Sequence, residues 1–98
     1  MSLSQNPGEN FDIANFQSEL DREIKLIFLA RDLNEGSLAM DRTAQLIADA
    51  YLATRGDTVS QSVLGASVNE VFATQPGKMV SSYQAVVWSE VASKLANS

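Results

Sequence analysis

The sequence predicts a small all-α domain, a bundle of four short helices, and three observations support this. Apolar residues recur every three or four positions along most of the chain, the spacing of a helix that buries one face. Segments rich in glycine, proline and polar residues separate these stretches. The length of 98 residues allows one modest core, since a chain of this size buries roughly 65% of its unfolded surface. We expect helices at 12–33, 38–55, 58–73 and 79–96, in a single helical domain at 11–98 that follows a flexible tail at 1–10.

The first helix is predicted from an amphipathic stretch that begins after Asp12. Asp12 is a candidate N-cap, and Phe11 before it is placed to form a hydrophobic staple. At 100° per residue, five apolar residues fall within an arc of about 80° and should face the core. They are Ile13, Phe16, Leu20, Ile24 and Ile27. A second apolar row lies away from that arc, and it consists of Leu26, Leu29 and Leu33.

The second helix is predicted to follow a turn at residues 34–37. Gly36 can take the left-handed position that ends a helix, and Ser37 is a candidate N-cap for the next one. Gly56 should end this second helix. Its expected core stripe is Met40, Ala44, Ile47, Ala48 and Tyr51.

The third helix has mixed signals, because its valines favour strand by propensity while their spacing is helical. Two capping-box patterns favour helix, one from Thr58 to Gln61 and one from Ser67 to Glu70. Gly65 lies between them. The segment is therefore either one helix with a weak point or two short helices joined by a turn, which would give five helices in all.

The fourth helix follows a turn predicted at 75–77, where proline and glycine occupy the second and third positions. A third capping-box pattern runs from Ser81 to Gln84, although we expect the helix to start near residue 79. Its core stripe is Val80, Tyr83, Val87, Val91 and Leu95. Three further residues widen the apolar surface on either side of that stripe, namely Met79, Val86 and Trp88.

The composition excludes several kinds of chemistry. The chain has no cysteine and no histidine, which removes disulfides, the usual zinc sites and any imidazole base. The acidic residues Glu19, Asp21 and Glu23 are close in sequence, but residues two apart on a helix do not face each other, so a solvated surface explains them better than a catalytic pair. Glycine-rich phosphate loops, EF-hand loops and nucleophile elbows are missing from the sequence. We therefore expect no enzyme activity, no cofactor, no metal site and no small-molecule substrate.

The net charge of −5 is unevenly distributed. The first 36 residues hold seven acids against three basic residues, whereas residues 58–98 carry two of each sign. No cluster of lysine and arginine of the kind that neutralises phosphates is present, which argues against nucleic acid as a partner. The sequence contains neither an apolar run of membrane-spanning length nor a secretory signal, so we expect a cytoplasmic protein with no membrane partner.

The apolar surface exceeds what one core needs, which predicts a role in contact with other proteins. Four short helices around a single core leave few helices fully enclosed, yet the first and the fourth both carry broad apolar surfaces. The interface candidates are Leu26, Leu29, Leu33, Met79, Val86 and Trp88. A central helix covered by its neighbours in a monomer would explain the same leucines. The leading hypothesis is a protein-protein interaction or assembly module, either a homo-oligomer or an adaptor for another protein.

Two alternatives from another class stay open. Residues 58–73 could form the helix-turn-helix of a DNA-binding regulator, with its turn at Gly65, although the second helix would offer Ser67, Asn69 and Glu70 instead of the usual lysine or arginine. An acidic protein can also occupy a nucleic-acid-binding groove by mimicking DNA, for which −5 is a modest charge. The sequence contains no motif specific to a known family.

Overall fold

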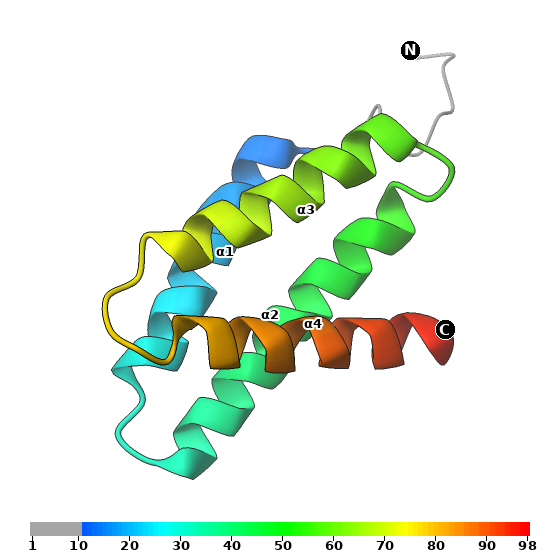
Figure 1. Ribbon diagram of the computed structural model, residues 1–98. Helices are drawn as coiled ribbons and strands as arrows, with labels where there is room; N and C mark the ends of the chain where they lie inside the picture. The colour runs from blue at the N-terminus through cyan, green and yellow to red at the C-terminus, as the bar shows by residue number, and fades with distance from the viewer. Residues whose placement is uncertain (1–10) are drawn as a thin grey trace.

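The structure, a computed structural model, describes residues 11–98 and contains four helices there (Figure 1). The helices are α1 at Ile13–Leu29, α2 at Leu33–Ala53, α3 at Thr58–Ala73 and α4 at Val80–Ala96. This part of the chain contains no strand, and the predicted all-α class is confirmed. The tail predicted at residues 1–10 lies outside the described residues.

Successive helices run in roughly opposite directions and pack in two layers (Figure 1). Helices α1 and α2 form one layer, on which α3 lies against α1 while α4 crosses α2. From the turn that joins them, α3 and α4 diverge and pack only lightly on each other. The α1–α2 and α3–α4 turns therefore lie at one end of the molecule, and the α2–α3 turn lies at the opposite end.

One core lies between the two layers and draws on all four helices. Four of the five residues in the stripe predicted for α1 are buried, and the fifth, Ile13, packs against them from the edge. Small alanines of α2 fill the contacts with the helices on both sides. The buried apolar residues are Phe16, Leu20, Ile24, Ile27, Ala39, Ala44, Ile47, Ala48, Ala50, Leu64, Val68, Phe72, Val87 and Val91.

The start of α1 confirms both features predicted for it. The Asp12 side chain accepts a hydrogen bond from the backbone N–H of Asn15 at 3.0 Å, as an N-cap does. The Phe11 and Phe16 rings pack with their centroids 5.7 Å apart. These two residues stand just before the cap and four positions after it, which is the geometry of a hydrophobic staple.

The predicted boundary between the first two helices is wrong. Helix α1 ends at Leu29, and α2 begins at Leu33 with Asp32 as its N-cap. Oδ1 of Asp32 accepts from the backbone N–H of Glu35 at 2.8 Å, and the Glu35 carboxylate in turn accepts from the backbone N–H of Arg31 at 3.0 Å. The first bond satisfies an N–H group that the first turn of α2 leaves free, and the second ties the residue before the cap to the same turn, so the chain begins the helix here.

The two residues expected to separate these helices instead lie inside α2. Gly36 does not take the left-handed conformation predicted for it, and Ser37 is not an N-cap. Leu33, which we placed at the end of the first helix, is instead the first residue of the second. The turn between α1 and α2 is thus only three residues long, at 30–32.

The turn between α2 and α3 contains the left-handed glycine predicted at this point, Gly56, whose φ is 87°. The cap of α3 is Asp57 and not Thr58: its carboxylate accepts from the backbone N–H of Ser60 at 3.0 Å and from the Ser60 hydroxyl at 2.7 Å. The Gln61 side chain, expected in a capping box, instead donates to the backbone oxygen of Thr54 at 3.3 Å.

Helix α3 is continuous through Gly65, which settles the choice between one helix and two. A Cβ at Gly65 would lie 3.2 Å from the hydroxyl oxygen of Tyr51 on α2, so glycine lets the two helices approach closely. Ser67 is buried inside this helix and accepts from the Gln17 amide at 3.0 Å instead of capping a new one. The turn that a helix-turn-helix would need at Gly65 is not formed.

Helix α4 starts at Val80, as expected, after a turn in which Gly77 has a φ of 103°. The capping box predicted at Ser81 is not formed, and the residue before the helix makes no side-chain cap. The Gln84 amide instead donates to Oδ1 of Asn69 on α3 at 2.7 Å, and the Trp88 indole N–H donates to the same oxygen at 3.0 Å. Asn69 therefore links α3 to α4 where their packing is light.

Candidate functional site

Large apolar side chains are exposed around the short turn between α1 and α2. Leu33 is 90% exposed and Leu29 is 71% exposed, and Leu38 and Leu26 nearby are also exposed. All four lie within 13 residues of one another along the chain. Met79, half exposed, stands across from them at the start of α4. We call the surface formed by these five residues, with the two depressions described next, the leucine end.

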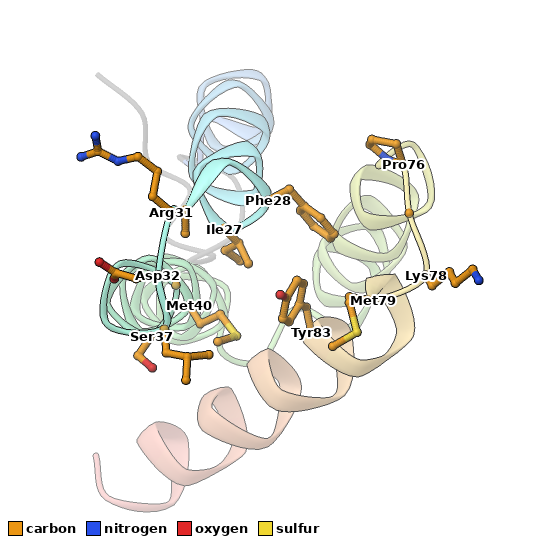
Figure 2. Close-up of a pocket in the computed structure, with 14 residues that line it drawn as sticks. Ile27, Phe28, Arg31, Asp32, Ser37, Met40, Pro76, Lys78, Met79 and Tyr83 are labelled. Carbon is orange, nitrogen blue, oxygen red and sulfur yellow. The ribbon is translucent and has the colours of Figure 1, made fainter.

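The larger depression is a cleft of about 470 Å³ between the α1–α2 turn and the α3–α4 turn (Figure 2). Leu33 and Met79 both line it. Phe28, Met40 and Tyr83 extend toward its middle from three different helices, α1, α2 and α4. The cleft therefore depends on the packed core and not on a single loop.

The floor of the cleft is built from partly buried aromatic and thioether side chains. The Phe28 and Tyr83 rings meet edge to face, with centroids 5.2 Å apart and planes at 73°. Phe28 also packs edge to face on the buried ring of Phe72, at 6.4 Å. Such aromatic pairs are a favoured arrangement, whereas Met40 and Met79 have flexible side chains that adapt to the shape of a contact.

The smaller depression is a hollow of about 190 Å³ on the other side of the same turn. Leu26, Leu29 and Leu38 line it, together with Ala39 of the core. Ala30 lines both depressions, so the cleft and the hollow are parts of one surface.

The charged residues of the leucine end are balanced and stand at its rim. Nη2 of Arg31 lies 3.1 Å from the Glu35 carboxylate, and Nε of Arg42 lies 3.2 Å from that of Glu23. Arg31 and Lys78 extend outward, away from the middle of the cleft (Figure 2). Exposed ion pairs of this kind contribute little to stability, but they keep the rim polar around an apolar centre.

Four of the six interface candidates named from the sequence meet at the leucine end, namely Leu26, Leu29, Leu33 and Met79. Val86 is exposed two turns further along α4 and lines neither depression. Trp88 is partly buried within the chain, where its ring meets the Tyr51 ring edge to face at 6.2 Å.

The sequence interpretation missed Leu38 and the aromatic floor of the cleft. The sequence predicts Leu38 only as the first residue of the second helix. In the structure it lies inside α2, on the exposed face and away from the buried face that contains Ala44 and Ile47. Phe28 could have been predicted as part of a site. It is a large apolar residue that lies between the core stripe and the leucine row of α1 and belongs to neither.

Residues 11–98 bring together no group of three acidic, histidine or cysteine side chains that could hold a metal ion. The helices of this part of the chain also include none with the length and apolar character needed to cross a membrane.

Comparisons with protein families, with curated proteins and with solved structures find no significant match.

Proposed function

We propose that this chain is a non-enzymatic protein-protein interaction module that assembles with further copies of itself through the leucine end. The observation that carries the proposal is the exposure of four leucines around one turn, beside a cleft whose floor is formed by aromatic and thioether side chains. Single exposed leucines are common on protein surfaces, whereas an apolar group of this kind with a polar rim is typical of an interaction site. Burying one leucine side chain fully contributes about 1.5–3 kcal/mol.

The backbone beneath these leucines supports the proposal. The turn at 30–32 is closed by the Asp32 cap and by the hydrogen bond from Arg31 N–H to Glu35. Leu33 and Leu38 lie on α2 itself, and Leu26 and Leu29 lie on α1. The exposed side chains are thus held on regular, hydrogen-bonded helices, which lowers the conformational entropy lost when a partner binds.

The proposal is tested by measuring the mass of the protein in solution with light scattering after size exclusion. We expect a mass above that of one chain, and we expect Leu29→Glu to reduce it, because a carboxylate would have to be desolvated in the contact. The matched control is Val59→Glu. Val59 is 74% exposed, like Leu29, but it lies at the start of α3 and lines neither depression.

Two results would contradict self-assembly through the leucine end. One is a monodisperse monomer at high concentration, which would leave only an adaptor for a different protein. The other is an equal loss of mass in Leu29→Glu and Val59→Glu, which would place the contact elsewhere or show a general effect of added charge.

A further inference from the structure

The most exposed large apolar side chain of the leucine end, Leu33, stands at the edge of the cleft. It is the first residue of α2, and the Asp32 cap precedes it directly. Its position is thus fixed by the helix, while 90% of its surface is open to solvent. Leu33 is a protruding apolar group beside a recessed apolar site.

The cleft has the size and lining to receive such a group. Its volume of about 470 Å³ lies within the range of about 300–1,000 Å³ that is common for binding pockets. Phe28, Met40 and Tyr83 give it an apolar floor, and Met79 covers one side while being half exposed itself. One leucine side chain with its neighbouring backbone would fit there without opening the core.

A protrusion and a recess on the same surface are what a two-fold symmetric contact needs. In such a contact both chains use the same surface. A group on the first chain fills the site on the second, and the same group on the second chain fills the site on the first. Leu33 and the cleft satisfy this condition because the leucine itself forms part of the cleft edge.

Charge favours a second copy as the occupant. The two depressions are lined by three basic residues, Arg31, Arg42 and Lys78, and two carboxylates, Asp32 and Glu35. The leucine end is therefore close to neutral, at +1, although the chain carries −5. Two copies can meet here without the repulsion that acidic surfaces would cause, whereas a strongly basic or acidic partner finds no excess of opposite charge.

The extent of the surface also fits a dimer. The cleft is lined by 14 residues and the hollow by seven, with Ala30 in both. A standard interface takes about 20–30 residues and about 800 Å² from each partner. The two depressions together have 20 lining residues, at the lower end of that range, and ~800 Å² is about one-eighth of the 6047 Å² of accessible surface.

We propose that the chain forms a two-fold dimer in which Leu33 of each copy enters the cleft of the other, between Met79 and the Phe28–Tyr83 pair. This inference rests on the proposed self-assembly and adds its geometry. Leu29 and Leu38, which line the hollow on the other side of the turn, then add apolar contact at the edge of the same interface.

Site-specific crosslinking tests this geometry directly, because the chain contains no cysteine of its own. Leu33→Cys and Met79→Cys are prepared as two separate variants, mixed in equal amounts and oxidised gently. We expect the disulfide between the two different variants to predominate over both same-variant disulfides, since a disulfide needs Cα atoms within about 7 Å. Ser62→Cys, on the exposed side of α3, is the control and should crosslink with neither.

A second measurement does not depend on added cysteines. Leu33→Ala should raise the dissociation constant of the dimer by at least about tenfold, as truncation of a central anchor does. Val86→Ala, which shortens an exposed side chain outside both depressions, should leave it unchanged.

The outcomes separate this inference from the proposed function. If light scattering shows a dimer but the mixed disulfide does not predominate, or Leu33→Ala binds as tightly as the unmodified chain, self-assembly stands and the insertion of Leu33 is overturned. If light scattering shows only a monomer, the proposed self-assembly fails, and the insertion fails with it.

Discussion

The turns before and after α2 are built in similar ways but present different surfaces. Each is short, and each ends at an aspartate that caps the next helix, Asp32 in one and Asp57 in the other. At the α2–α3 turn, polar side chains bond to the backbone. The Gln61 amide donates to the backbone oxygen of Thr54, and the buried hydroxyl of Thr54 donates to the backbone oxygen of Ala50. At the α1–α2 turn leucines extend into solvent instead.

This difference shows that exposed leucines are not a by-product of a poorly formed turn. Both turns contain backbone hydrogen bonds, and both end in an aspartate cap. The polar side chains of the α2–α3 turn bond to its own backbone, whereas the α1–α2 turn carries leucines that the core does not use. Substitutions at the two ends should therefore separate folding stability from association. Four such substitutions follow, ordered from the largest expected effect on folding to the smallest.

The largest effect is expected from Gly56→Ala at the α2–α3 turn. Gly56 has a φ of 87°, and nothing lies within 4 Å of where a Cβ would be. The cost is therefore one of backbone conformation, about 1–2 kcal/mol of unfolding free energy. Urea denaturation followed by circular dichroism measures it, and an unchanged midpoint would mean that the turn does not depend on this conformation.

Gly36→Ala is the matched substitution at the other end, and it should have the opposite sign. Gly36 lies inside α2, and an added Cβ would make an ordinary contact at 3.7 Å with the Cβ of Ala30. Alanine should raise the unfolding free energy by about 0.5–1 kcal/mol, because glycine loses more backbone entropy in a helix. Destabilisation by this substitution would favour the boundary near Gly36 that the sequence suggested.

Asp57→Asn should change how stability depends on pH. The hydrogen bonds from Ser60 hold the pKa of Asp57 below its ordinary value of 3.8. The ionised carboxylate thus stabilises the fold above pH 3.8, and this contribution is lost as the pH falls from 3.8 through the lower pKa of the folded state. Asparagine caps without titrating, so the stability difference between the two proteins should shrink in acid. A constant difference at all pH values would contradict this assignment.

Leu33→Glu should have the smallest effect on folding and still abolish association. Leu33 is 90% exposed, and surface substitutions of this kind change the unfolding free energy by less than about 0.5 kcal/mol. An acidic residue in the first turn of a helix is also favourable. Urea denaturation at low protein concentration measures the change in unfolding free energy, and light scattering measures the loss of association. Loss of more than about 1 kcal/mol would show that Leu33 packs within its own chain.

Much of the fold could be predicted because the signals for it are local. The stripe of α1, the Asp12 cap and the glycine turns at Gly56 and Gly77 depend on residues a few positions apart. The boundary at 30–37 was wrong because two local signals competed there. The Asp32–Glu35 pair satisfies N–H groups directly, and Gly36 is tolerated inside a helix at modest cost.

The question that the sequence left open at Gly65 has a tertiary answer. Gly65 looks like a break in the sequence, but it allows Tyr51 of the neighbouring helix to come close, and no local pattern contains that information. The candidate site shows the same limit. The sequence revealed surplus leucines, but only the packing of α4 against α2 places Met79 and Tyr83 opposite them and creates the cleft.

The position of Trp88 has a practical consequence for all of these experiments. It is the only tryptophan in the chain, and it lies where α2, α3 and α4 meet, between Tyr51 and Asn69. Its fluorescence should therefore follow the docking of α4 and report folding, while remaining insensitive to whatever covers the other end of the molecule. The protein thus carries its own optical probe for one of the two events, so folding and association can be followed separately in the same sample.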